Sequence, residues 1–427
     1  MKKRILSVVL CAAMVLTMFV GCGKDGDSNG VQKITWMFWD DLNATEDLIS
    51  KGYKDVVDRF NKDYEGKYQV EVVTTNLEEY YPKLNALVAG KETPDCFIVS
   101  PGPNLDVYVE PGKVADLTSY LEKDGWLDSF NGGKGAFSQQ TYDGKIYAVP
   151  LNIAAACVFY NTEMFEDAGI TTMPTDYNGL LDACKKLKDK GYTPITISAG
   201  TAWCLSMLCG YLCDSEGVDL DKLNSGDASW LDSNVVNAVN KMVELSQYFQ
   251  DTAAGDTNDV ATANFYNGEA AMLIQGSWAI GQINGANPDF EKKCGVFAFP
   301  GTNGRVIAKS DSLAMSASTK HPEAVIAFMK YFTDDTAQKY TAEVGGKIPV
   351  TTVQYDADKA PAELAYVMDV FKNAKSTFGF YNESMASTEA GSTFDDAMVS
   401  IYLKQNSVEA GLQIVEDFYK NNVWNKD

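Results

Sequence analysis

Hydrophobic positions along this chain follow two spacings, one typical of strands and the other of amphipathic helices. Short apolar runs at 34–39 and 96–99 predict buried strands. Between them, apolar residues recur every three or four positions at 48–60 and 81–88, which predicts helices, the first with Thr45 as its N-cap. Because strands and helices alternate, we expect parallel sheets that are covered by helices on both faces.

The same alternation returns in the second half of the chain. Apolar runs at 157–160, 195–197 and 270–274 predict strands, and helical spacing marks 180–187 and 323–332. The last part is mainly helical, and the sequence contains no internal repeat. A chain of this length favours two or three domains over one. The sequence therefore predicts an α/β protein that is built from two lobes.

The first 22 residues have a pattern of their own. The basic sequence MKKR precedes an uncharged apolar run at 5–20, which is too short for a stable membrane span and predicts an export signal peptide over 1–21. Its Gly-Cys ending resembles a bacterial lipobox, in which Cys22 is acylated and becomes the mature N-terminus. We therefore expect a protein anchored by lipid to the extracellular face of the cytoplasmic membrane, with a polar tether over 22–30. An ordinary signal peptide cleaved elsewhere is the alternative.

The charge balance limits the classes of partner. The chain has a formal net charge of −22, which opposes binding to nucleic acid and to anionic lipid headgroups. We therefore expect no nucleic-acid partner, and contact with the membrane through the lipid anchor only. The same charge favours solubility at high local density, and we expect a monomer.

Cysteine and histidine usage argues against a metal or nucleophile site. Beyond the signal and Cys22, seven cysteines lie in apolar segments, an odd number without the spacing of a disulfide framework. Cys204, Cys209 and Cys213 could approach one another on one helix, but no histidine or carboxylate completes a tetrahedral set there, so a metal site is the minority alternative. The sequence has one histidine, His321, and no phosphate-binding glycine motif. We expect no cofactor, no metal and no catalytic residue.

Adjacent carboxylates occur at 40–41, 78–79 and 395–396, and a glycosidase needs two carboxylates that are spaced across a sugar. Neighbouring side chains diverge on strands and on helices, so none of these pairs forms a catalytic dyad by itself. Catalytic pairs usually come from separate strands. A secreted glycoside hydrolase therefore stays open as an alternative, without a motif in its favour.

Three tryptophans follow the ends of predicted strands. Trp39 comes directly after the first strand, Trp203 follows 195–197, and Trp278 follows 270–274. In open parallel sheets, ligands bind beyond the carboxyl ends of the strands. Flat apolar rings beside short polar groups suit sugars, because C–H faces stack on the ring while hydroxyls bind polar side chains. The alternative for each ring is core packing, which we expect for Trp36 and Trp126.

Four segments carry a resemblance to a known family. They are YYPKL at 80–84 followed by TPD at 93–95, YDGKIYAVP at 142–150, VFYNTEMF at 158–165 followed by AG at 168–169, and NGEAAM at 267–272 leading to GSW at 276–278. With the order of the elements, they make the chain resemble the extracellular solute-binding proteins of bacterial carbohydrate ABC transporters, the family that includes the maltose-binding type. The resemblance covers about 33 to 419.

The resemblance implies a two-lobed fold with a hinge and an interlobe cleft. Chain crossings are implied near 149–152, 309–312 and 346–351, so that the first lobe holds 31–149 plus 310–350 and the second holds 150–309 plus 351–427. It also implies a receptor without enzymatic activity, which captures a sugar, an oligosaccharide in our interpretation, and hands it to the permease subunits of an ABC transporter. Closure of the hinge on the ligand is part of that implication.

The resemblance also implies roles for individual residues. Trp39 and Asp41 match the loop that contacts sugar in this family, Trp278 matches its stacking aromatic residue, and Trp203 lies where another aromatic residue is common. Asn152 and Asp311 lie at implied crossings that face the cleft, with hydrogen bonding in the hinge as an equal alternative. The full set of expected ligand-binding residues is Trp39, Asp40, Asp41, Asn152, Trp203, Trp278 and Asp311.

The identity of the ligand stays open at this point. After TPD at 93–95, the maltose-binding type has a tryptophan and charged groups, whereas this chain continues with 99–102, VSPG. That departure argues against maltodextrin specificity. A polyamine, a metal chelate or a peptide in the same kind of fold is the remaining alternative to a sugar, although three aromatic strand ends favour sugar.

Overall fold

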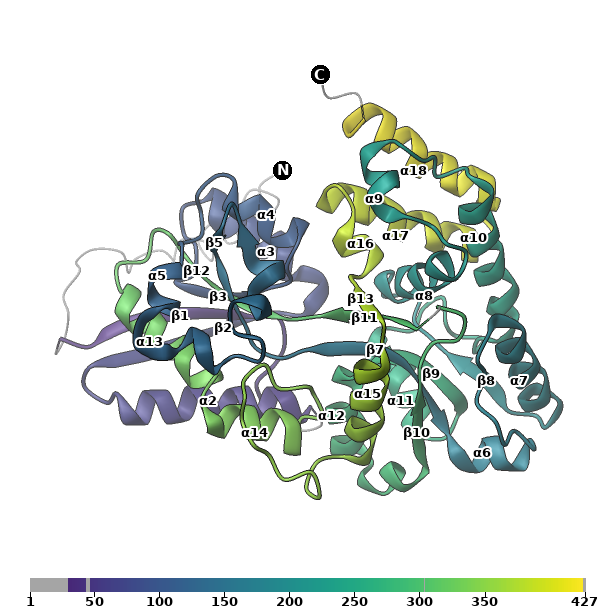
Figure 1. Ribbon diagram of the computed structural model, residues 1–427, viewed down its shortest axis with the longest axis horizontal. Helices are drawn as coiled ribbons and strands as arrows, with labels where there is room; N and C mark the ends of the chain where they lie inside the picture. The colour runs from purple at the N-terminus through teal and green to yellow at the C-terminus, as the bar shows by residue number, and fades with distance from the viewer. Residues whose placement is uncertain (1–29, 44–46, 303, 425–427) are drawn as a thin grey trace, which may run out of the picture.

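The computed structural model describes residues 30–43, 47–302 and 304–424, which form two lobes side by side (Figure 1). The central sheet of the first lobe has the order β2-β1-β3-β12-β6. Its strands are β1 (Gln32–Phe38), β2 (Tyr68–Thr74), β3 (Cys96–Val99), β6 (Ala148–Pro150) and β12 (Ser312–Met315). Its helices are α2 (Leu48–Asp63), α3 (Leu77–Ala89), α4 (Pro103–Val109), α5 (Thr118–Leu121), α13 (Pro322–Phe332) and α14 (Asp335–Glu343). A small hairpin joins β4 (Thr141–Tyr142) to β5 (Lys145–Ile146).

The second lobe has the sheet order β13-β11-β7-β9-β8, with β10 paired to β7. Its strands are β7 (Ala154–Asn161), β8 (Thr193–Thr196), β9 (Ala270–Gly276), β10 (Cys294–Phe297), β11 (Arg305–Lys309) and β13 (Ser376–Phe378). Its helices before β11 are α6 (Thr162–Asp167), α7 (Tyr177–Asp189), α8 (Trp203–Ser215), α9 (Leu220–Ser225), α10 (Ser233–Leu245), α11 (Asn258–Tyr266) and α12 (Trp278–Ala286). Its later helices are α15 (Ala362–Asn373), α16 (Tyr381–Ser384), α17 (Thr388–Tyr402) and α18 (Val408–Asn422).

The sheets are mixed, so the prediction of parallel sheets is wrong in part. β1 pairs in parallel with β2 and β3, and β8 pairs in parallel with β9. In contrast, β12 is antiparallel to β3 and β6, and β7 is antiparallel to β9, β10 and β11. β6 continues into β7, and β11 into β12, across short links at 151–153 and 310–311. The direction of these strands is therefore fixed by the crossing between lobes and not by a strand–helix–strand unit.

The chain passes between the lobes a third time between α14 and α15. The three crossings are hydrogen-bonded to one another: the Leu151 N–H donates to the Asp311 carbonyl at 2.8 Å, and the Ile153 N–H donates to the Ile348 carbonyl at 2.9 Å. The exact residue limits of the lobes stay a prediction. Three crossings held together in this way form a narrow connection about which two lobes can rotate.

The start of α2 differs from the sequence prediction. Thr45 lies outside the described residues, and the N-cap is Asp47, whose side chain accepts hydrogen bonds from the N–H groups of Ile49 and Ser50. Threonine and aspartate are both good N-cap residues, and Asp47 is the N-cap because it comes directly before the first helical turn.

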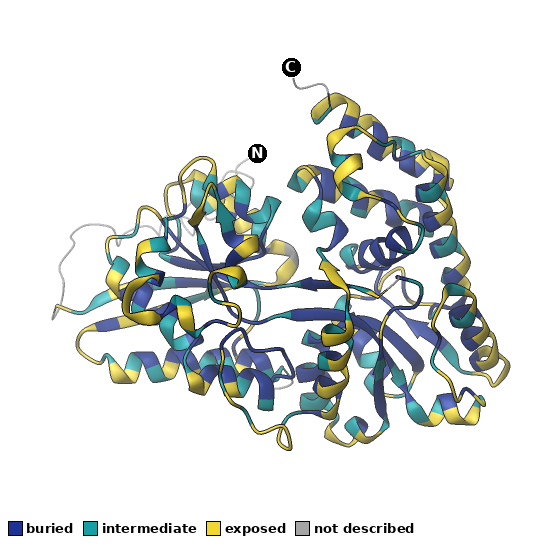
Figure 2. Cartoon of the chain, viewed as in Figure 1, coloured by how far each residue is buried: buried dark blue, intermediate teal, exposed yellow. Residues whose placement is uncertain are grey.

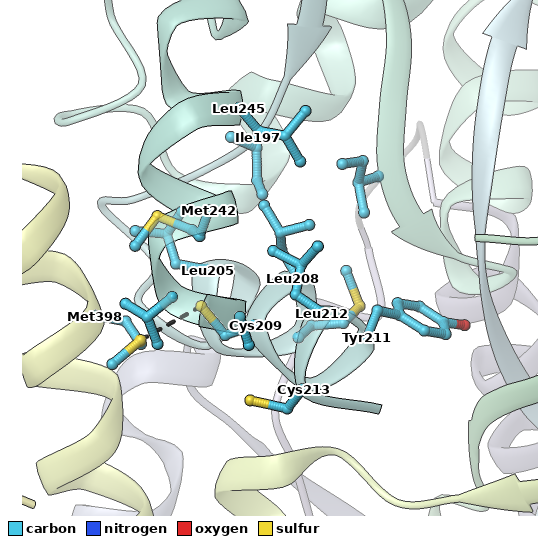
Figure 3. Close-up of a cluster of buried hydrophobic side chains, with 14 of the residues drawn as sticks. Ile197, Leu205, Leu208, Cys209, Tyr211, Leu212, Cys213, Met242, Leu245 and Met398 are labelled. Atoms are coloured by element: carbon cyan, nitrogen blue, oxygen red, sulfur yellow. Dashed lines mark hydrogen bonds between the residues drawn. The ribbon is translucent and has the colours of Figure 1, made fainter. Parts of the chain in front are cut away.

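Each lobe has its own buried core (Figure 2). Trp36 and Trp126 lie in the core of the first lobe, as the sequence predicted, and are 0% and 7% exposed. In the second lobe, α8 is buried on every side from Cys204 to Asp214, so its cysteines act as core side chains. Figure 3 shows Cys209 directed at Met398 of α17, with 3.3 Å between the sulfur atoms.

No group of three or more His, Cys, Asp or Glu side chains within the described part of the chain is arranged to hold a metal ion. Cys204, Cys209 and Cys213, the minority alternative for a metal site, lie in the hydrophobic core of the second lobe. Of the helices that the structure describes, none is long and apolar enough to cross a membrane. Cys22 and the predicted signal peptide lie outside the described residues.

Candidate functional site

The first part of the site lies at the carboxyl end of β1. Trp39 follows the strand directly, is half-buried, and packs edge-on against Tyr80 of α3 with ring centroids 5.4 Å apart. Phe38 and Tyr81 are its other aromatic neighbours, at 6.3 Å and 6.4 Å. The Tyr81 hydroxyl accepts a hydrogen bond of 3.0 Å from the N–H of Ser100, which comes directly after β3. Trp39 and Ser100 therefore lie beyond the same edge of the parallel strands β1 and β3.

The second part lies at the carboxyl ends of β8 and β9. Trp203 begins α8 and Trp278 begins α12, and their ring centroids are 5.8 Å apart. Phe380, directly before α16, packs against both, at 6.1 Å from Trp203 and 5.8 Å from Trp278. We call these three residues the aromatic cluster. Trp203 and Trp278 are partly exposed, unlike the fully buried Trp36.

Gly276 fixes the place of the Trp278 ring. A Cβ atom at Gly276 would lie 2.0 Å from Cζ3 of Trp278, so only glycine leaves room for the ring against the end of β9. Trp203 and Phe380 pack on the same ring, so the indole cannot move away without disturbing both. The GSW sequence at 276–278 therefore has a steric basis.

This close contact makes a testable prediction. We expect Gly276→Ala to displace Trp278, to lower stability by about 1–3 kcal/mol through overpacking, and to weaken ligand binding by about tenfold. Calorimetric titration and thermal unfolding measure the two effects. Gly135→Ala is the matched control, because a Cβ at Gly135 has open space around it. Equal affinity in both variants would show that the position of Trp278 does not affect binding.

Lys309 connects the two parts of the site. It is the last residue of β11, at the crossing, and its side chain is 19% exposed. The ammonium lies 3.0 Å from the Glu383 carboxylate of α16 and 3.4 Å from the Ser100 hydroxyl of the first lobe. It also lies over the Phe380 ring, 5.1 Å from the centroid. A continuous path of contacts therefore runs from Trp39 through Tyr81, Ser100 and Lys309 to the aromatic cluster.

Asn152 and Asp311 lie in the crossings and are buried. The Asn152 amide donates to the Tyr53 hydroxyl at 2.9 Å, and Asp311 forms ion pairs with Lys309 at 3.9 Å and Lys347 at 3.7 Å. Both residues thus contribute to the hinge, and each also has one buried oxygen, Oδ1, without a hydrogen bond. A buried acceptor without a donor costs about 1–3 kcal/mol. The Asp311 Oδ1 faces the Lys309 ammonium at 3.9 Å, so of the two it is the Asn152 Oδ1 that lacks a partner of either kind.

Asp40 and Asp41 follow Trp39 in different environments. Asp41 is exposed and accepts a hydrogen bond from the N–H of Asn43 at 2.9 Å. Asp40 is half-buried, and its Oδ1 accepts from the N–H of Asp41 at 2.8 Å. Burial, together with the negative charges of Asp47 and of Asp259 on α11, raises the pKa of Asp40 to about 6. The negative charge of Asp259 on the second lobe therefore acts on the Asp40 carboxylate of the first lobe.

Contacts link Trp39 to Trp203 and Trp278 through several residues that the sequence analysis did not name as site residues. Trp39, Asp40 and Asp41 lie on the first lobe, Trp203 and Trp278 on the second, and Asn152 and Asp311 between them. Tyr81, Ser100, Lys309, Phe380 and Glu383 were missed. Phe380 and Glu383 lie in a segment without strand or helix periodicity, and only their contacts with residues distant in sequence mark them.

The model of the bacterial extracellular solute-binding protein family matches residues 55–369, which is most of the chain. An uncharacterized ABC transporter extracellular-binding protein of Pyrococcus horikoshii is 26% identical over 368 residues, covering 82% of this chain and 80% of the relative. The multiple sugar-binding protein of Streptococcus mutans is 25% identical over 360 residues, covering 77% and 83%.

Solved structures share the two-lobed fold. A chitin oligosaccharide binding protein superposes with a TM-score of 0.83 at 22% identity, over 91% of this chain and 98% of that protein. At this identity the likeness describes the fold alone. The matching family consists of binding proteins and not of enzymes.

Proposed function

Because this chain belongs to the bacterial extracellular solute-binding proteins, we propose that it captures a sugar between its lobes and delivers it to the permease of an ABC importer. The observation that carries the proposal is the aromatic cluster, which is joined by a path of contacts to Trp39 on the other lobe. Sugar rings would stack on Trp39, Trp203 and Trp278, while Asp40, Asp41, Asn152 and Asp311 accept hydrogen bonds from hydroxyls. Aromatic rings on both lobes suit an oligosaccharide better than a single ring.

The charges at the boundary support a neutral ligand over a polyamine. Glu383 is already paired with Lys309, and Asp311 lies between Lys309 and Lys347. A diamine would have to compete with these lysines for the carboxylates. Hydroxyl groups, in contrast, can donate to the Asn152 Oδ1, which has no hydrogen bond, without displacing a charge.

The N-terminal sequence supports a proposal for the location. We propose that Cys22 carries the lipid anchor, that the protein acts as a monomer outside the cytoplasmic membrane, and that it leaves its ligand unchanged. The lipobox-like GC at 21–22 after an apolar run supports the anchor. Mass spectrometry of the N-terminal peptide tests it, since an unmodified N-terminus at another residue would exclude acylation of Cys22.

A ligand screen by thermal shift tests the proposed function. Neutral mono- and oligosaccharides, polyamines and peptides are added one at a time to the purified protein. We expect neutral oligosaccharides to raise the melting temperature, because a ligand at 100 times its Kd stabilises the folded state by about 2.7 kcal/mol. Stabilisation by polyamines or peptides alone would contradict the proposal.

The same samples distinguish a receptor from a hydrolase. After incubation, chromatography should return each stabilising oligosaccharide at its original length. Shorter products, formed at a rate that depends on protein concentration, would instead support a secreted glycoside hydrolase. Because the matching family consists of binding proteins, we expect no cleavage.

A further inference from the structure

The side chain of Lys309 contacts both lobes and the crossing between them. Ser100 belongs to the first lobe, Glu383 belongs to the second, and Asp311 lies in the crossing. Burial alone would lower the pKa of Lys309, but the negative charges of Glu383 and Asp311 outweigh it and leave the pKa above its ordinary value. The ammonium is therefore a positive charge whose position is fixed by Ser100, Glu383 and Asp311.

The lobes touch at the same place. A Cβ atom at Gly102, directly before α4 in the first lobe, would lie 2.8 Å from the Glu383 carbonyl oxygen in the second. The Glu383 side chain is 21% exposed, so its ion pair with Lys309 is shielded from water and from salt more than a surface pair. Lys309 and Glu383 both belong to the second lobe, so their ion pair holds the two side chains in place, while the contacts across the boundary are the Lys309–Ser100 hydrogen bond and the approach of Gly102 to Glu383.

The ammonium also occupies a position that a ligand could use. It lies over the Phe380 ring and beside two carboxylates, which is the environment that binds organic ammonium ions. Because the protein fills this position with its own side chain, a ligand amine next to the aromatic cluster meets a positive charge. The uncharged hydroxyl groups of a sugar meet no such repulsion.

We propose that Lys309 is a positioning and specificity-determining residue: its ammonium is held by Glu383 of its own lobe, joins that lobe to the first through Ser100 beside the aromatic cluster, and excludes cationic ligands by filling the ammonium position itself. The specificity rests on the proposed function, whereas the joining of the lobes does not depend on which ligand is bound. Removal of the ammonium should open the lobes and leave a vacant site for a small alkylammonium ion.

Chemical rescue of Lys309→Ala tests this proposal without any sugar. We expect the variant to have a larger radius of gyration than the wild type by small-angle X-ray scattering, and a lower melting temperature. In Lys309→Ala, n-propylammonium chloride should reverse at least half of the increase in radius and at least half of the decrease in melting temperature. Sodium chloride at the same concentration should reverse neither. The wild type should not respond to the amine, because its ammonium position is occupied.

Two further variants are controls. Lys309→Met keeps most of the side-chain volume without the charge, so we expect it to open like Lys309→Ala but not to respond to the amine. Lys292→Ala removes an exposed ion pair with Asp289 and should behave as the wild type. The proposal is overturned if the amine affects wild type and Lys309→Ala alike, or if Lys309→Met has the wild-type radius of gyration. Should Lys309→Ala not fold, the radius of Lys309→Met decides.

Discussion

Replacing Trp278 with alanine is expected to weaken sugar binding by about 2–4 kcal/mol, as for an aromatic residue at the centre of a binding site. In affinity this is a loss of about 30- to 1000-fold. The ring is partly exposed and packs against Trp203 and Phe380, so its removal takes away stacking surface for the ligand and also loosens the two neighbours. Isothermal titration with the sugar that gives the largest thermal shift measures the effect.

Trp424→Ala provides the matched control for this experiment. Trp424 is also partly exposed and lies in the second lobe, but it follows α18 and packs on Tyr419 and Gly226. We expect a loss of stability in this variant and an unchanged Kd. If Trp278→Ala binds the sugar as tightly as Trp424→Ala does, then Trp278 is not a ligand-binding residue.

The second large effect concerns Glu363, a buried carboxyl group in the first turn of α15. It is 0% exposed, and burial, with a contribution from the charge of Glu291, raises its pKa to about 7. Its Oε2 accepts a long hydrogen bond of 3.4 Å from the Asn284 amide, while Oε1 and the Asn284 Oδ1 have no hydrogen bond. Hydrogen bonding with the Asn284 amide and the Cys294 thiol acts in the opposite direction, but burial outweighs it and keeps the pKa raised.

The direction of the pH dependence follows from this raised pKa. Between the unfolded pKa of 4.5 and the folded pKa of about 7, the folded state binds a proton that the unfolded state has lost. Stability from this group is therefore complete below the unfolded pKa and falls as the pH rises through the folded one. From about pH 5 to about pH 8, we expect a loss of about 2–3 kcal/mol from this residue.

Glu363→Gln should remove this share of the pH dependence, because glutamine is neutral at every pH of the series. Urea unfolding followed by tryptophan fluorescence at the two pH values measures it in wild type and variant. Glu409→Gln is the control, since Glu409 lies in the first turn of α18 but is exposed. A wild-type pH dependence in Glu363→Gln would mean that Glu363 does not take up a proton on folding.

The sequence predicted those features that depend on residues close together in the chain. Trp203 and Trp278 come directly after the ends of two strands, and those strands are parallel neighbours, so the two rings had to meet at one edge. Trp36 was predicted to be buried because it lies inside an apolar run, and it is. The position of each tryptophan relative to its own strand is contained in a few consecutive residues, whereas the pairing of β8 with β9 is long-range.

The remaining features depend on residues that are distant in sequence. Lys309 and Glu383 are 74 positions apart, and neither has a local pattern that marks it. Strand direction at the crossings could not be predicted either, because an apolar run such as 154–161 has the same pattern in a parallel and an antiparallel sheet. The N-cap of α2 was missed because Thr45 and Asp47 are both acceptable caps and periodicity does not choose between neighbours.

The central claim is that a sugar is held by aromatic rings from both lobes, and a crystal structure of the complex with the best-stabilising oligosaccharide tests it most directly. The account predicts sugar rings stacked on Trp203 and Trp278 of the second lobe and in contact with Trp39 of the first. A sugar bound at another place on the protein, with these three rings bare, would contradict it.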